Sequence, residues 1–156
     1  MTTRKRALWA FVILLLFVLA GDLIHKATEV IYPKPTGLAR PAPACDLSAG
    51  PCTAYFAAGG QVAFEVEPHG IPVARPLVLR VTTQGLEVTA VAVDFVGRDM
   101  NMGYNRPVLV PDGPGRYRGT GMLPVCVRER MTWEARVLLT TPRGLLAAPF
   151  HFATSS

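Results

Sequence analysis

Apolar and polar residues alternate one by one along several segments in the second half of the chain. In residues 61–67, Val62, Phe64 and Val66 are separated by polar or small residues, and residues 131–139 repeat this spacing. Successive side chains of a β-strand point to opposite faces, so this alternation places the apolar side chains on a single face. The pattern predicts strands that each bury one face against a common core.

About seven such segments follow one another after residue 54. Turns rich in glycine and proline separate them, for example at residues 111–115 and 141–144. Short strands joined in this way are typical of all-β sandwich domains. We therefore expect residues 54–156 to form an immunoglobulin-like β-sandwich of about seven strands. The predicted strands cover residues 61–67, 77–81, 87–95, 108–110, 117–127, 131–139 and 145–152.

The chain begins with a basic segment that is followed by an apolar one. Residues 4–6 are Arg-Lys-Arg, and the apolar run that follows reaches Ile24, with Asp22 near its boundary. A membrane-spanning helix needs about 20 apolar residues, so this run is just long enough to cross a bilayer. We expect residues 1–26 to form a single-pass anchor that contacts the lipid bilayer through residues 7–24.

Cleavage of this segment as a signal peptide is the alternative. Residues 18–20 (Val-Leu-Ala) offer small side chains at the spacing of a cleavage site. In both cases, positive residues before an apolar segment hold the N-terminus in the cytoplasm. The sequence thus predicts an inner-membrane protein whose C-terminal domain lies in the periplasm.

Prolines punctuate the segment that joins the anchor to the predicted sandwich. Proline fixes its own φ and has no amide hydrogen, so a high density of proline disfavours helix and gives a stiff, extended chain. We expect residues 27–53 to form a connector of low structure, which holds the sandwich clear of the bilayer. Its prolines are Pro33, Pro35, Pro41, Pro43 and Pro51.

Three cysteines, Cys45, Cys52 and Cys126, follow the apolar segment. An oxidising compartment favours disulfides, and an odd number of cysteines leaves one thiol over. A local disulfide between Cys45 and Cys52 would close a small loop within the connector. Pairing of either residue with Cys126 would instead tie the connector to the sandwich. In a third interpretation, Cys126 is a thiolate that binds metal.

Sulfur-containing side chains are concentrated between positions 100 and 131. Five of the eight sulfur atoms of the chain lie there, and Met100 and Met102 are two residues apart. Residues i and i+2 of an extended chain share a face, so both sulfurs would point to one place. Soft thioether and thiolate ligands select Cu(I) over zinc, magnesium or calcium. The candidate metal ligands are Met100, Met102, Cys126, Met122 and Met131.

Core packing is the competing explanation for these methionines, because a flexible thioether fills irregular gaps. Against it, Asp99, Asn101 and Asn105 surround the pair and predict an exposed turn. His151, between two phenylalanines, is the best of the three histidines as a further ligand. Trp133 either fills the core or covers a bound Cu(I) with its ring.

Two functional classes have no support in the sequence. The net charge is +5, but three of the cations precede the apolar segment and no basic run follows. Nucleic-acid binding is therefore not expected. The chain has no G-x-S-x-G motif and no glycine loop of the kind that holds phosphate. We expect a protein that is not an enzyme.

Two segments of the predicted sandwich resemble the closing half of FixH-like and YtkA-like domains. They are residues 113–119 (Gly-Pro-Gly-Arg-Tyr-Arg-Gly) and residues 131–137 (Met-Thr-Trp-Glu-Ala-Arg-Val). The resemblance covers residues 60–152 together with the anchor. It implies an anchored, exported immunoglobulin-like domain linked to copper handling and haem–copper oxidase assembly. Of the family's ligand set only Met100 and Met102 carry over, since no histidine lies beside them; the three cysteines are additional.

The sequence therefore leads to one expected function and one alternative. The expected function is binding of Cu(I) by an anchored periplasmic domain that helps deliver copper to a membrane copper enzyme or helps assemble it. The alternative is a metal-free accessory subunit that docks its sandwich on a larger membrane protein complex. In that case the methionines form an adaptable contact surface.

Overall fold

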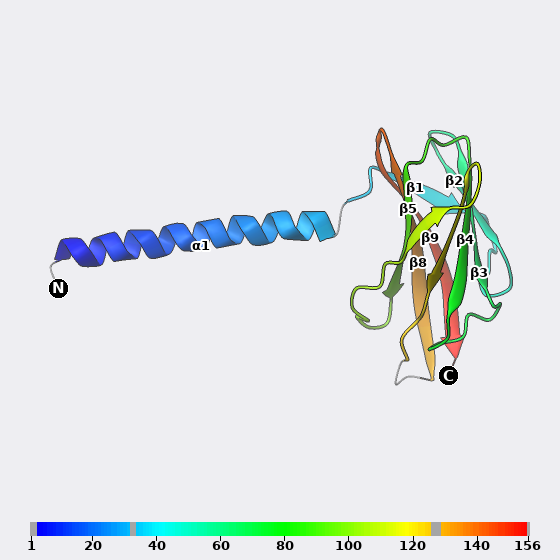
Figure 1. Cartoon of the computed structure of the whole chain (residues 1–156). Helices are drawn as coiled ribbons and strands as arrows, with labels where there is room; N and C mark the ends of the chain where they lie inside the picture. The colour runs from blue at the N-terminus through cyan, green and yellow to red at the C-terminus, as the bar shows by residue number, and fades with distance from the viewer. Residues whose placement is uncertain (1–2, 32–33, 126–128, 156) are drawn as a thin grey trace. The chain divides into compact units, whose positions relative to one another are not determined.

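The computed structural model describes residues 3–31, 34–125 and 129–155 (Figure 1). The chain divides into two compact units, Met1–Lys34 and Pro35–Ser156. The predicted domain boundaries, at residues 26 and 53, differ from this division. The first unit contains one helix and the second contains the strands.

Helix α1 (Thr3–Ile31) has 29 residues and is therefore about 43 Å long at 1.5 Å per residue. Its segment Arg4–Thr28 has a mean hydropathy of 2.6 and is long and apolar enough to cross a membrane, either as an anchor or as a signal sequence. Large apolar side chains such as Leu14 and Phe17 are exposed along it. The predicted N-terminal apolar helix is confirmed, and it continues to Ile31, beyond the expected end at residue 26.

Within the described ranges, the second unit contains nine strands, so the prediction of a mostly β protein with one N-terminal helix is confirmed. The expected number of strands was seven, and each of the seven predicted segments overlaps one of the nine. The strands are β1 (Gly37–Pro41), β2 (Cys52–Phe56), β3 (Gln61–Glu67), β4 (Leu77–Gln84), β5 (Ala90–Gly97), β6 (Val108–Pro111), β7 (Arg116–Gly121), β8 (Arg130–Thr141) and β9 (Gly144–Ser155).

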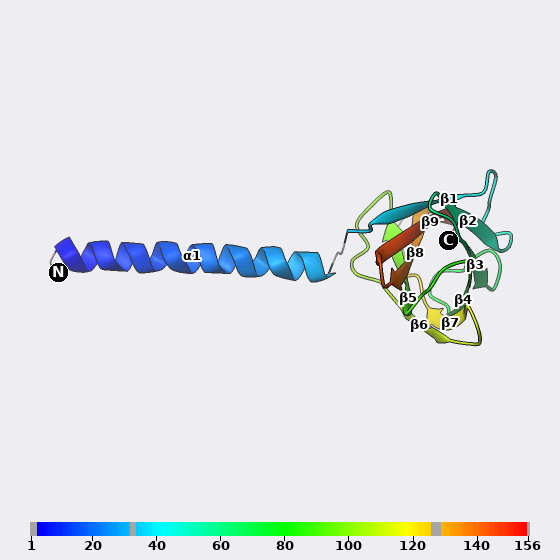
Figure 2. The same cartoon turned by 90° about the horizontal axis from the view of Figure 1, so that it is seen from above.

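The strands close into a barrel in the order β1-β2-β3-β4-β7-β6-β5-β8-β9, which is seen from above in Figure 2. Two strands divide their pairing and so join the two halves of the wall. Strand β1 pairs with β9 at Gly37 and Leu38, and with β2 from Ala39 onward. Strand β6 pairs with β5 through Leu109 and with β7 through Val110. These divided strands make the fold a nine-stranded barrel, which is more specific than the expected sandwich.

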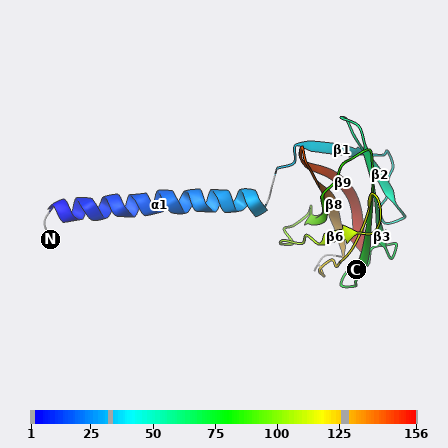
Figure 3. The same ribbon diagram turned by 45° about the horizontal axis from the view of Figure 1, so that its top comes forward.

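Part of the expected connector belongs to the barrel wall. Strand β1 crosses between β9 and β2, as Figure 3 shows, and β2 begins at Cys52. The amide of Thr36 also donates to the carbonyl of Leu145 at 2.7 Å. The prediction of low structure for residues 27–53 therefore differs from the observed fold. The reason is that this proline-rich stretch is held by backbone pairing with distant strands and by burial of Ala39 and Leu47 in the core.

The core contains the apolar faces that the alternation predicted. Val62, Phe64 and Val66 are fully buried on β3, and Trp133 is fully buried on β8. The ring of Phe64 lies 5.7 Å from that of Phe150 on β9, so opposite walls of the barrel meet at these rings. The indole nitrogen of Trp133 donates to the hydroxyl of Thr154 at 3.0 Å, and Trp133 is therefore a core residue.

The barrel has two distinct ends. We call one the sulfur end: β5 and β7 finish there, at Gly97 and Gly121, and β8 begins there. The C-terminal residues of β9 lie at this end because Ser155 pairs with Arg130. We call the other the entry end, because Thr36 joins the barrel there beside the turn between β8 and β9. The ends are about 40 Å apart if measured along twelve-residue β8.

Candidate functional site

Residues 98–107 connect β5 to β6 at the sulfur end, and we call them the methionine loop. The loop begins against β8, where the amide of Arg98 donates to the carbonyl of Thr132 at 3.0 Å. The amide of Thr132 in turn donates to the carboxylate of Asp99 at 2.7 Å. The loop returns along β5, because the amide of Phe95 donates to the carbonyl of Asn105 at 2.9 Å. Both ends of the loop are thus held by backbone contacts.

An ion pair adds to this attachment. The guanidinium of Arg106 lies 3.1 Å from the carboxylate of Asp94 on β5, and both side chains are nearly buried. The guanidinium carbon also lies 5.1 Å from the centre of the Tyr104 ring, a cation–π distance. The returning arm of the loop is therefore fixed by charge as well as by backbone hydrogen bonds.

The tip of the loop is an irregular turn. The side-chain oxygen of Asn101 accepts a hydrogen bond from the amide of Gly103 at 2.9 Å, and Gly103 has a φ of 79°, which favours glycine. The expectation that Met100 and Met102 share one face rested on an extended chain, and the turn removes that basis. Met100 is 38% exposed, whereas Met102 packs against the core.

Two of the methionines meet at Gly97, the last residue of β5. A Cβ atom placed on Gly97 would lie 2.3 Å from the methyl of Met131 and 2.8 Å from Cγ of Met102. Met131 is 1% exposed and belongs to the core. The missing side chain of Gly97 therefore makes room for both residues, and Met131 fills the end of the core beneath the loop.

Met122 lies just after β7 and is 54% exposed. Its carbonyl accepts a hydrogen bond from the side-chain amide of Asn105 at 2.9 Å. The next residue, Leu123, is buried, and its carbonyl accepts a hydrogen bond from the amide of Ala74 at 2.8 Å. Asn105 thus joins the methionine loop to the Met122 segment. No signal in the sequence indicated this link, because asparagine in a turn has many uses.

The structure therefore brings together part of the predicted ligand set. Met102 and Met131 converge at Gly97, and Asn105 ties Met122 to the loop that carries Met100. Met131 is in the core rather than at an accessible position. Cys126 lies outside the described residues, so its role as a ligand stays a prediction.

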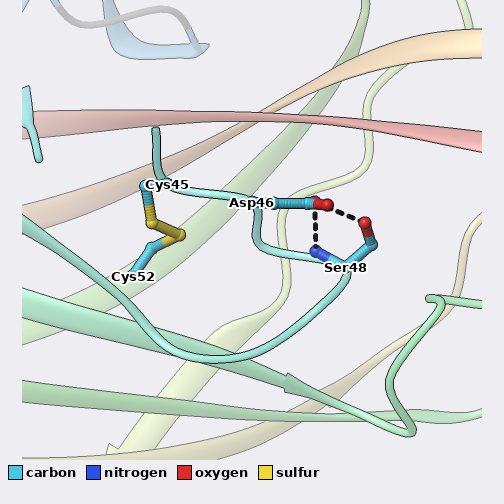
Figure 4. Close-up of a disulfide and its surroundings, with 4 residues drawn as sticks. All are labelled: Cys45, Asp46, Ser48 and Cys52. Carbon is cyan, nitrogen blue, oxygen red and sulfur yellow. Dashed lines mark hydrogen bonds between the residues drawn. A yellow bond between two sulfur atoms is a disulfide. The ribbon is translucent and has the colours of Figure 1, made fainter. Parts of the chain in front are cut away.

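Cys45 and Cys52 form a disulfide, which Figure 4 shows, with 5.7 Å between their Cα atoms. This confirms the local pairing and excludes a bond from either residue to Cys126. Inside the closed loop, the hydroxyl and the amide of Ser48 both donate to the carboxylate of Asp46, the amide at 3.0 Å. These hydrogen bonds hold the pKa of Asp46 below its usual value.

His151, the further candidate ligand, is engaged with a carboxylate. Its Nε2 lies 3.1 Å from Glu134, which also accepts a hydrogen bond from Nε of Arg136 at 3.0 Å. Burial alone would raise the pKa of Glu134. The hydrogen bonds from Arg136 and His151 outweigh burial, so the pKa lies below the ordinary value. The three residues form a polar cluster on adjacent strands β8 and β9.

Two other features bear on the choice of site. Across the described parts of the chain, no three His, Cys, Asp or Glu side chains come together as a metal site. A cavity of about 650 Å³ opens at the entry end, with Leu38, Phe56 and Leu146 in its lining, and none of its lining residues carries sulfur. The methionine loop and Met122 are therefore the candidate metal-binding groups.

Comparison with known proteins adds little to this picture. No family model matches the chain, and no curated protein matches it. Among solved structures, the chain is similar to a DUF4785 family protein from Legionella pneumophila subsp. pneumophila str. Philadelphia 1, at 16% sequence identity and a TM-score of 0.44. The match covers 62% of this chain and 28% of that protein. A likeness of this size supports no conclusion, and the resemblance to FixH-like and YtkA-like domains stays a prediction.

Proposed function

We propose that the protein is a membrane-anchored, periplasmic Cu(I)-binding protein that helps deliver copper to a membrane copper enzyme, such as a haem–copper oxidase, or helps assemble it. The role is binding rather than catalysis. The observation that most supports it is the link between Met122 and the methionine loop, which gathers three accessible or half-buried thioethers at one end of the barrel.

The ligands in this proposal are Met100, Met102 and Met122, with Cys126 as a further ligand from the sequence. Thioethers are soft and uncharged, so a set of them favours Cu(I) over harder cations. Met100 and Met122 are exposed, so a bound ion would remain open to ligand exchange with a partner. Met131 is buried, and we assign it to packing beneath the loop.

Two features support an exported, anchored protein. The disulfide between Cys45 and Cys52 is typical of oxidising compartments such as the periplasm. Helix α1 is long and apolar enough for a single span, and basic residues 4–6 precede most of it. By the distribution of positive charge, the barrel would lie on the periplasmic side of the inner membrane. The resemblance to FixH-like and YtkA-like domains supports the same arrangement and a copper enzyme as the partner.

Competition titration tests the proposal. The full-length protein in detergent is titrated anaerobically with Cu(I) against a chromophoric chelator, alongside the variant Met100→Leu/Met102→Leu. We expect the parent to withdraw one Cu(I) from the chelator and the double variant to lose at least about tenfold in affinity. Met131→Leu, a core change of similar volume, is the matched control and should bind like the parent. Equal binding by the double variant and the parent would refute the proposal.

Docking without metal is the second candidate, and the exposed side chains at the sulfur end favour it. Tyr104, Met122 and Val125 are 60%, 54% and 67% exposed, and methionine surfaces adapt well to partners. Co-purification with a membrane complex after stripping of copper separates the two candidates. Retention that is independent of metal and lost in Tyr104→Ser would favour docking.

A further inference from the structure

Asn105 makes two hydrogen bonds that connect different parts of the fold. Its backbone carbonyl accepts the amide of Phe95 at 2.9 Å, which fixes it to central strand β5. Its side-chain amide donates to the carbonyl of Met122, 17 residues away, at 2.9 Å. Asn105, which is fixed to β5, therefore contacts the segment that follows β7.

The Met122 segment depends on such contacts because it is not part of a strand. Leu123 anchors it on one side through its buried side chain and through the hydrogen bond from Ala74. The hydrogen bond from Asn105 fixes the backbone of Met122 itself. A methionine side chain has three rotatable bonds, so its sulfur stays within reach of a site only if its backbone is fixed.

We propose that Asn105 is a positioning residue: it holds Met122 beside the methionine loop so that Met122 acts as the third thioether ligand of Cu(I). This inference rests on the function proposed above. Residues that orient metal ligands without touching the metal commonly change affinity by about 10- to 100-fold when they are replaced. Asn105 therefore acts on the metal through Met122 alone.

Asn105→Asp is a sharp test because aspartate has nearly the same shape. An ionised carboxylate only accepts hydrogen bonds, so it cannot donate to the carbonyl of Met122. The matched control is Gln61→Glu, the same chemical change at the entry end. The side-chain amide of Gln61 donates to Gln84 at 2.8 Å, and neither residue lies near the sulfur end.

The experiment compares five full-length chains in detergent: the parent, Asn105→Asp, Met122→Leu, the double variant and the control Gln61→Glu. Cu(I) affinity is measured by competition, and the number of bound sulfurs by X-ray absorption. We expect each single variant to lose about tenfold in affinity and one sulfur. The double variant should lose no more than either single one, because Asn105 acts through Met122. Gln61→Glu should match the parent.

Two results would overturn the inference: unchanged affinity in Asn105→Asp, or losses that multiply in the double variant. A measurement without metal distinguishes failure of the inference about Asn105 from failure of the proposed Cu(I)-binding function. In the absence of copper, Asn105→Asp should speed amide hydrogen exchange at Met122, Leu123 and Val125, relative to Gln61→Glu. If exchange speeds up but the parent binds no Cu(I), Asn105 does hold the Met122 segment but the proposed copper function is refuted. If exchange is unchanged, Asn105 does not hold the Met122 segment and the inference is refuted.

Discussion

Arg106 and Asp94 form an ion pair at 3.1 Å that fastens the methionine loop to β5, and only 12% and 8% of the two side chains are exposed. Removal of one partner from a buried ion pair typically costs about 3 kcal/mol, because the remaining charge loses its counter-ion. We expect Asp94→Ala to lower the free energy of unfolding by about this amount.

Chemical denaturation of the full-length protein measures this loss. Glu67→Ala, which breaks the exposed ion pair between Glu67 and Arg80, is the control and should change stability little. Equal losses of stability in the two variants would mean that the ion pair of Arg106 and Asp94 stabilises the fold no more than an exposed pair does.

Gly97 should not tolerate a side chain. A Cβ there would lie 2.5 Å from the backbone carbonyl of Met100, as well as against the flexible Met131. A side chain can move aside, but the carbonyl can move only with the loop. We expect Gly97→Ala to cost about 1–3 kcal/mol and to weaken Cu(I) binding by displacing Met100. Gly50→Ala, where a new Cβ meets nothing within 4 Å, is the control. Unchanged stability of Gly97→Ala would contradict the packing described here.

The disulfide between Cys45 and Cys52 should stabilise the barrel, because it closes a short loop next to β2. By the loop-entropy argument, its removal in Cys45→Ala/Cys52→Ala should cost about 2 kcal/mol. The unreduced, denatured parent should show one reactive thiol of its three cysteines. Thiol titration and denaturation measure both effects. Three reactive thiols in protein purified without reductant would contradict the pairing.

Acid should destabilise the barrel in part through Glu134. Its pKa is lower in the folded protein than its ordinary value. A carboxyl of this kind stabilises the fold above its unfolded pKa, and the contribution is lost as the pH falls through the folded pKa. We expect the free energy of unfolding to fall below about pH 4, and Glu134→Gln to reduce the size of that fall.

Urea denaturation at a series of pH values measures this slope. Glu87→Gln, an exposed carboxyl at the entry end, is the control and should follow the parent. A parent-like slope for Glu134→Gln would assign the acid sensitivity to other groups.

Strand β3 could be predicted because its side-chain burial repeats every two residues. On β3, Val62, Phe64 and Val66 are buried in alternation, and this pattern is legible in sequence. Among the five described residues of β1, only Ala39 is buried, and the strand owes its conformation to pairing with β2 and β9. Pairing with residues a hundred positions away leaves no local pattern. This is why the closure of the barrel was not foreseen.

The same reason limits prediction of the site. The enrichment of sulfur was visible in sequence, but the common face of Met100 and Met102 was inferred from a regular strand, and Gly103 lies in a turn. The contact of Asn105 with Met122 joins segments whose proximity depends on the complete fold. The single local clue was Asp94, an acidic residue within an otherwise apolar strand, where a buried partner is to be expected.

The divided pairing of β1 has a consequence for contacts between copies of this protein. When two copies meet, an unpaired outer strand invites the neighbour to add its own strand, which is a first step toward aggregation. Each described strand of this barrel has a hydrogen-bonded neighbour on both sides. Because β1 occupies the edge of β9 at Leu146 and Ala147, a second copy cannot add a strand at that part of the edge.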